Sequence, residues 1–143
     1  MKLKRLVLTG AAGRLGSYLR EPLSKLADEL VSSDLKEDIG TLYPGERYVR
    51  ADLTDKVAIH ALLEGADMVV HFGAVPDEAS FEQIVGPNII GAYHIWEAAY
   101  LQGLKRVVYA SSIHAVGMYP RQDLIGVDAP HRPDTFYGLA KCF

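Results

Sequence analysis

A glycine-rich turn directly after the first apolar run restricts the folds open to this chain. The turn spans residues 9–16 (TGAAGRLG), follows a run at 6–8 that is typical of a buried strand, and opens a helical pattern that begins at about residue 14. Glycines placed in this way permit a tight turn, let a diphosphate approach the backbone, and let the helix pack closely on the strand. The turn therefore predicts a dinucleotide-binding site, and a purely structural turn is the alternative. The residues expected to bind the cofactor here are Gly10, Ala12, Gly13, Arg14, Leu15 and Gly16.

Apolar runs alternate with helical patterns along the rest of the chain. Strands are expected at 6–8, 30–33, 47–50, 67–72 and 105–110, and helices at 14–28, 55–64 and 88–101. Thr54 is the expected N-cap of the second helix. Nearly continuous apolar strands separated by helices indicate a parallel sheet covered on both faces. We therefore predict one α/β domain over residues 1–143, a doubly wound parallel sheet with a Rossmann fold.

Acidic residues at two strand ends bear on the choice of cofactor. Asp34 ends the second expected strand, where its carboxylate can accept hydrogen bonds from both hydroxyls of an adenosine ribose. The same carboxylate would repel a 2′-phosphate, so the sequence favours NAD over NADP, although Arg14 could pair with such a phosphate. Asp52 and Leu53 follow the third strand and could contact adenine; the alternative for Asp52 is a carboxylate that only stabilises a helix start.

A tyrosine and a lysine stand four residues apart near the end of the chain, at Tyr137 and Lys141. In a helix that begins near Tyr137 both side chains share one face, because each residue rises about 1.5 Å. A nearby ammonium favours tyrosinate and so lowers the pKa of a phenol from its usual value of about 10. The pair is therefore a candidate base with its charge partner.

The composition excludes several classes of partner. A net charge of −3 with no run of Lys or Arg offers no general attraction for nucleic acid or an anionic membrane. Cys142 is the only cysteine, which rules out a disulfide framework and fits a reducing compartment. The apolar segment near the N-terminus breaks at residues 9–10, too early for a signal peptide or a membrane span. We expect a cytoplasmic protein.

The helix expected at 88–101 is apolar on all sides. Its apolar residues are Ile89, Ile90, Tyr93, Ile95, Trp96, Ala98, Ala99 and Leu101. A helix of this kind is buried on more than one side. One side can face the sheet, and the other is expected to meet either a second subunit, which would give a homo-oligomer such as a dimer, or further packing within the chain.

Several motifs occur in a characteristic order. They are the turn at 9–16, Asp34, the segment His71-Phe72-Gly73-Ala74, Asn88, Ser111-Ser112 and Tyr137-x-x-x-Lys141. In this order they resemble the extended short-chain dehydrogenase/reductases, the family of NAD-dependent epimerases, dehydratases and dehydrogenases. Within it, segments 88–93, 111–120 and 132–143 are most similar to uronate dehydrogenases, which oxidise the anomeric carbon of a cyclic hexuronic acid to an aldaric acid lactone and form NADH. The resemblance covers the whole chain and implies an NAD-dependent oxidoreductase that acts on a sugar or sugar acid.

The resemblance also implies a role for each site residue. Tyr137 takes the proton from the anomeric hydroxyl, while Lys141 lowers the pKa of Tyr137 and holds the nicotinamide ribose. Ser112 hydrogen-bonds the reacting oxygen, and Ser111 is the neighbouring candidate. The other implied residues are Phe72, Gly73 and Ala74 for the cofactor, and Val75 and His114 for the substrate.

Three polar residues near the expected site also have non-catalytic explanations. His114 could simply pack in a loop, and a metal site is not expected because no second ligand lies at the right spacing. His71, at a strand end, is expected to be a buried core histidine. Asn88 is expected to fix the backbone near the site through its amide.

The chain departs from the family pattern in three ways. Uronate dehydrogenases usually have Asn where this chain has Ile113 and Ser where it has Pro76, so two polar groups that can face a substrate are absent. Extended family members also continue well beyond the Tyr-x-x-x-Lys motif. We therefore expect a truncated chain with weak or no turnover unless something completes it. The alternatives to a dehydrogenase are a nucleotide-sugar epimerase or dehydratase of the same fold and a non-catalytic NAD-binding module.

Overall fold

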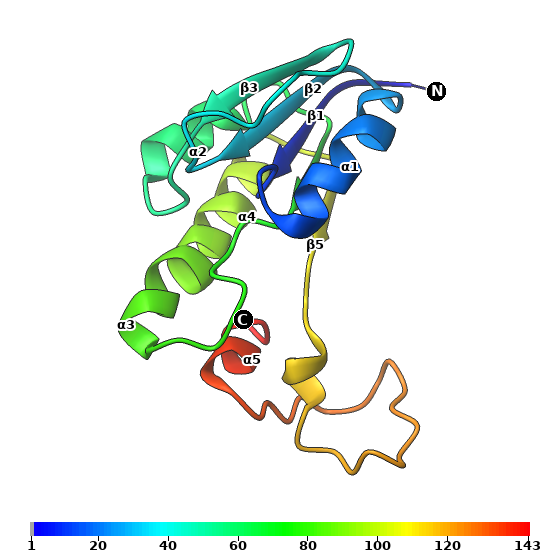
Figure 1. The fold of residues 1–143 in the computed structure, drawn as a ribbon, viewed down its shortest axis with the longest axis vertical. Coiled ribbons are helices and arrows are strands. Elements are labelled where there is room, and N and C mark those ends of the chain that lie inside the picture. The colour runs from blue at the N-terminus through cyan, green and yellow to red at the C-terminus, as the bar shows by residue number, and fades with distance from the viewer. Residues whose placement is uncertain (1) are drawn as a thin grey trace.

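One five-stranded sheet forms the centre of the computed structural model, which describes residues 2–143. The strands are β1 Leu3–Thr9, β2 Ala27–Asp34, β3 Glu46–Arg50, β4 Met68–His71 and β5 Arg106–Tyr109, in the order β3-β2-β1-β4-β5 (Figure 1). Every neighbouring pair is parallel. The carboxyl ends of all five strands therefore lie at one edge of the sheet, and the predicted doubly wound α/β fold is confirmed.

Helices cover both faces of the sheet. They are α1 Arg14–Ser24, α2 Lys56–Leu62, α3 Phe81–Ile84, α4 Gly91–Leu101 and α5 Phe136–Ala140, with a π-helical turn η1 at Val85–Ile90 and a 3₁₀ turn η2 at Ile113–Val116. The helix α1 packs on one face, whereas α2 and α4 pack on the other (Figure 1). The sheet is thus the middle of three layers.

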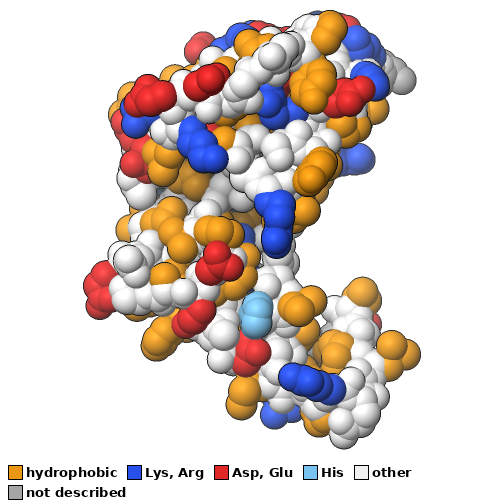
Figure 2. All heavy atoms as spheres, viewed as in Figure 1, with side chains coloured by type: hydrophobic (Ala, Val, Ile, Leu, Met, Phe, Trp, Pro, Cys, Tyr) orange, Lys and Arg blue, Asp and Glu red, His pale blue; other side chains and the backbone are white. Residues whose placement is uncertain are grey.

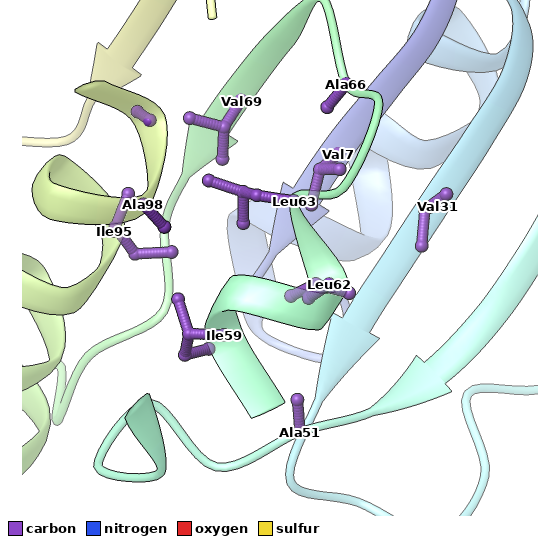
Figure 3. Packing of buried hydrophobic residues seen from close by; sticks show 11 residues of the cluster. Val7, Val31, Ala51, Ile59, Leu62, Leu63, Ala66, Val69, Ile95 and Ala98 are labelled. Carbon is purple, nitrogen blue, oxygen red and sulfur yellow. The ribbon is translucent and has the colours of Figure 1, made fainter. Parts of the chain in front are cut away.

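The apolar strand residues divide between two cores because successive side chains of a strand point to opposite faces. Leu6 and Leu8 belong to the core beneath α1. Val7, between them, belongs to the core that Ile59 of α2 and Ile95 of α4 complete (Figure 3). All five side chains are fully buried. Each contributes about 1.5–3 kcal/mol relative to an exposed side chain, which explains why both faces of the sheet need a helical cover.

Several predicted element boundaries are wrong: β1 and β2 begin at Leu3 and Ala27, earlier than expected, and two helix boundaries also differ. The helix α1 continues only to Ser24, because β2 already begins at Ala27. Asp55, not Thr54, is the N-cap of α2, and its carboxylate accepts a hydrogen bond from the Ala58 N–H at 3.0 Å. A carboxylate is the stronger acceptor for a helix start. Because Asp55 follows Thr54, α2 begins one residue later than expected, at Lys56.

The segment predicted as one helix at 88–101 begins as the π-helical turn η1 and continues as α4. Pro87 lies in η1 and has no N–H to donate, which favours an irregular turn there. The α4 side chains of Ile95 and Ala98 are buried against α2, while Tyr93 and Trp96 are 57% and 43% exposed. These two line a groove of about 400 Å³ with Phe143. The second apolar side of this helix therefore has only partial cover from residues 2–143.

Residues after β5 leave the sheet and form the lower part of the molecule (Figure 1). There α5 packs against α3 and η2, close to the C-terminus. Figure 2 shows a narrower waist between this part and the body that carries the sheet, with a hollow on one side. Among residues 2–143, no helix has the length and apolar character needed to cross a membrane.

Candidate active site

A cleft of about 700 Å³ opens at the carboxyl edge of the sheet. Its walls come from the ends of β1 and β2, from the start of α1, from the segments after β3, β4 and β5, and from α5. Predicted site residues that line it are Gly10, Ala12, Gly13, Arg14, Leu15, Gly16, Asp34, Asp52, Leu53, Phe72, Gly73, Ala74, Val75, Tyr137 and Lys141. In the part of the chain that the structure describes, no cluster of three or more His, Cys, Asp or Glu side chains could hold a metal ion.

Backbone contacts require glycine at two positions of the turn after β1. Gly10 has a φ of +72°, and a Cβ there would lie 2.6 Å from the nitrogen of Gly73 in the loop after β4. A Cβ on Gly16 would lie only 1.9 Å from the carbonyl oxygen of Gly10. Gly13 is the N-cap of α1, whose first turn contains no acidic residue. The turn and the helix start therefore form a cradle that fits a diphosphate.

Asp34 lies at the end of β2 and is fixed against the turn. Its Oδ2 accepts from the Ala12 N–H at 2.9 Å, and its Oδ1 accepts from the Leu35 N–H at 2.8 Å. Each carboxylate oxygen has lone pairs left for a ligand hydroxyl. Lys36 also lines the cleft, and its ammonium donates to the Ala12 carbonyl at 3.4 Å. The sequence interpretation missed Lys36; its position two residues beyond Asp34 is the signal that could have found it.

Side chains also hold the loops after β3 and β4. Asp52 Oδ1 accepts from both the N–H and the hydroxyl of Thr54 at 2.8 Å, so this carboxylate organises the approach to α2 while it lines the cleft. The buried amide of Asn88 accepts from the Val75 N–H at 2.7 Å and donates to the Val75 carbonyl at 3.0 Å. The expectation that Asn88 fixes backbone at the site is confirmed. Pro76 lines the cleft, whereas Ile113 is 81% exposed and does not.

The short helix α5 brings Tyr137 and Lys141 to the cleft. A Cβ on Gly138 would lie 2.2 Å from the carbonyl oxygen of His114, so the close approach of α5 to η2 depends on glycine. Lys141 is only 6% exposed. Its ammonium lies 4.8 Å from the centre of the Tyr109 ring and 5.7 Å from that of Tyr137. The aromatic rings therefore replace part of the water around this buried cation.

The pKa of Tyr137 moves in the opposite direction from the sequence expectation. Burial raises the pKa of this phenol, a hydrogen bond from Ser112 opposes that rise, and the Asp77 carboxylate adds to it. Burial also lowers the pKa of Lys141 to about 8. The Lys141 ammonium, which faces the Tyr109 ring, does not offset the effect of burial on Tyr137. In this structure the phenol therefore keeps its proton at neutral pH.

Ser112 and His114 lie beside Tyr137 but do not line the cleft. Ser112 is the N-cap of η2: its hydroxyl accepts from the His114 N–H at 3.2 Å. The His114 ring is edge-on to the Tyr137 ring at 6.2 Å, and its Nδ1 lies 2.8 Å from Oδ1 of Asp134. Asp134 was not singled out from the sequence. Ser111, the neighbouring candidate, is the serine that lines the cleft.

His71 is a buried core histidine, as expected, and it makes the stability of the fold depend on pH. Its Nδ1 is hydrogen-bonded to the Thr9 hydroxyl at 2.6 Å. Burial, and secondarily the charge of Lys141, lowers the pKa of His71 from 6.5 to about 3. Between pH 6.5 and 3, His71 is therefore protonated in the unfolded chain but neutral in the folded chain. The free energy of unfolding falls as the pH drops through this range.

We expect the loss to reach about 1.4 kcal/mol for each pH unit in that window. Urea unfolding at about pH 7 and about pH 5 measures it. His71→Gln should reduce the slope of stability against pH in this range, and the exposed control His131→Gln should keep it. An equal slope in the parent and in His71→Gln would contradict the assignment.

This chain is similar in sequence and in structure to several known enzymes. Uronate dehydrogenase of Pseudomonas putida is 48% identical over 139 residues, which are 97% of this chain and 52% of that enzyme. The structure of a mutant uronate dehydrogenase from Agrobacterium tumefaciens complexed with NAD superimposes with a TM-score of 0.93 and 45% identity, over 98% of this chain and 52% of that one. Glucuronic acid dehydrogenase from Chromohalobacter salexigens gives a TM-score of 0.94 and 45% identity, over 99% and 53%. This chain spans about half the length of the curated relatives it matches.

A family model, that of the NAD dependent epimerase/dehydratase family, matches residues 6–143. The match runs from β1 to the last residue, so it includes the glycine-rich turn, Asp34 and the helix that carries Tyr137 and Lys141. The chain belongs to the NAD dependent epimerase/dehydratase family.

Proposed function

We propose that this chain binds NAD and carries the catalytic side chains of a dehydrogenase that oxidises the anomeric carbon of a hexuronic acid to an aldaric acid lactone. The observation that carries the proposal is a single cleft lined by the glycine-rich turn and Asp34 and also by Tyr137 and Lys141. The similarity to uronate dehydrogenases supports this class of substrate.

The residues of the cleft fit NAD. The turn at 10–16 leaves its backbone and the start of α1 open to a diphosphate. The fixed carboxylate of Asp34 can accept from the ribose hydroxyls and would repel a 2′-phosphate, which favours NAD over NADP. Phe72, Gly73 and Ala74 line the cleft beside the turn, and Asp52 and Leu53 line it after β3. When bound, NAD supplies the acceptor for the hydride that leaves the sugar.

Tyr137 is the proposed base. As the C1–H bond of the sugar breaks with its electron pair and the C1=O bond of the lactone forms, the phenolate takes the proton of the anomeric hydroxyl. Ser112, which lies beside Tyr137, orients the reacting oxygen, and Lys141 holds the nicotinamide ribose. Val75 and His114 are the proposed further substrate contacts. Because burial raises the pKa of Tyr137, the base form grows with pH, and turnover should be faster in alkaline solution than at neutral pH.

Incubation of the natural protein that carries this chain with NAD and galacturonate or glucuronate tests the proposal, with the absorbance of NADH as the readout. We expect NADH with at least one uronate and none with the corresponding neutral hexoses. NADH with another sugar but with no uronate would contradict the substrate class. In a parallel incubation with a nucleotide sugar, formation of an isomer without net NADH would favour an epimerase. NAD binding without any turnover would favour a non-catalytic module.

A homodimer and a cytoplasmic location are further proposals. The half-exposed Tyr93 and Trp96 of α4 and the adjacent groove support a subunit contact on that face. Sedimentation of the natural protein as a clean monomer would remove the dimer. Fractionation that finds the protein outside the cytoplasm would contradict the location.

A further inference from the structure

A glutamate in the loop after β4 reaches across to the start of the helix that carries Tyr137. The Glu78 carboxylate accepts from two successive backbone N–H groups: Oε1 from Phe136 at 3.1 Å and Oε2 from Tyr137 at 2.9 Å. The contact joins parts of the chain that are 58 and 59 residues apart in sequence. One of the two donors is thus the backbone of the proposed base itself.

This contact completes the hydrogen bonding of the first turn of α5. The first N–H groups of a helix have no partner within the helix. In α5 the Thr135 hydroxyl accepts from the third of them, Gly138, at 2.8 Å, and Glu78 accepts from the first two. A five-residue helix has little stability of its own, so tertiary contacts such as these decide whether it is formed. Hydrogen bonds to a charged carboxylate are the stronger kind.

Glu78 also belongs to a loop that is fixed at its other end. Asn88, buried in η1, holds both the N–H and the carbonyl of Val75. Val75, Pro76 and Asp77 line the cleft, and Glu78 follows them directly. A continuous series of hydrogen bonds and short backbone therefore runs from η1 through this cleft wall to the N–H of Tyr137.

We propose that Glu78 is a positioning residue, and this proposal rests on the proposed dehydrogenase function. Glu78 clamps the first turn of α5 to the loop after β4 and so holds the Tyr137 phenol at the cleft. Glu78 does not line the cleft, and its two carboxylate oxygens accept from the backbone of α5, so its action goes through the helix and not through contact with the sugar. The clamp therefore fixes the distance between the loop at 75–77 and the Tyr137 phenol, and so between that phenol and a sugar or cofactor bound to the loop.

Glu78→Ala and Glu78→Gln in the natural protein test the clamp by two readouts. Amide hydrogen exchange of Phe136 and Tyr137 should become about tenfold faster in Glu78→Ala. Glu78→Gln keeps one carbonyl oxygen as an acceptor and should restore part of the protection. In the NADH assay, kcat should fall about tenfold or more in Glu78→Ala, while the KM for NAD stays within about twofold.

The matched control is Glu64→Gln. Glu64 is an exposed glutamate after α2, at the edge of the sheet opposite the cleft, and its substitution should change neither readout. Unchanged exchange at Phe136 and Tyr137 in Glu78→Ala would overturn the clamp, as would an equal effect of Glu64→Gln. If the parent forms no NADH with any uronate, the proposed function fails by itself, while the exchange measurement still supports or overturns the clamp.

Discussion

Replacing Tyr137 with phenylalanine is expected to lower kcat for uronate oxidation by about 10²–10⁴-fold, the usual contribution of a positioned acid or base. The phenol hydroxyl is the group that takes the proton, and Phe keeps the ring that faces His114 and Lys141. The shape of the cleft and its affinity for NAD should therefore change little. Initial rates of NADH formation and calorimetric titration with NAD measure the two effects separately.

Tyr100→Phe is the matched control, because Tyr100 is 85% exposed near the end of α4, away from the cleft. It removes the same hydroxyl and should leave kcat unchanged. Turnover by Tyr137→Phe at the parent's rate would show that another group is the base. An equal loss of NAD affinity would instead point to damage of the cleft.

Replacing Gly16 with alanine is expected to remove most of the affinity for NAD and to destabilise the fold. The new Cβ would lie 1.9 Å from the carbonyl oxygen and 2.8 Å from the carbonyl carbon of Gly10, and both atoms are backbone. The turn and α1 would have to move apart, which costs about 1–3 kcal/mol or more for an overpacked site. The same movement separates the helix start from the phosphate position. Each 1.4 kcal/mol lost in binding is about a tenfold weaker affinity.

Gly126→Ala gives the comparison for this change. No atom lies within 4 Å of a Cβ built on Gly126, so the substitution adds the same methyl group in open space and should alter stability by less than about 0.5 kcal/mol. Urea unfolding and NAD titration of the two variants test the prediction. Equal NAD affinity in Gly16→Ala and the parent would contradict the proposed phosphate cradle.

Much of the fold could be predicted because it depends on local patterns. The apolar runs at β1, β2 and β4 are what strands buried on both faces require. Gly16 is needed by a contact within the turn, and Gly10 by its positive φ as well as by its contact with the loop after β4. Helix limits were less predictable. Asp55 and Thr54 are both good caps, and only the observed bond to the Ala58 N–H distinguishes them.

Site residues at the end of a single strand could be predicted from the sequence. Contacts between segments that are far apart in the sequence could not. Asp34 lies at the end of β2 beside the glycine-rich turn, and the amide of Asn88 holds the backbone of Val75, as the sequence predicted. The bonds from Phe136 and Tyr137 to Glu78 depend on how the loop after β4 meets α5, and no spacing in the sequence encodes them. The rise in the pKa of Tyr137 depends on burial in three dimensions, which a four-residue spacing does not reveal.

Transfer of deuterium from the sugar to the cofactor tests the proposed oxidation of the anomeric carbon. The natural protein is incubated with NAD and galacturonate or glucuronate that carries deuterium at the anomeric carbon, and the reduced cofactor is examined by mass spectrometry. We predict one deuterium on the nicotinamide for each lactone formed, with a slower rate than for the unlabelled uronate. Reduced cofactor without deuterium, or labelled uronate recovered unchanged beside active consumption of another substrate, would contradict it.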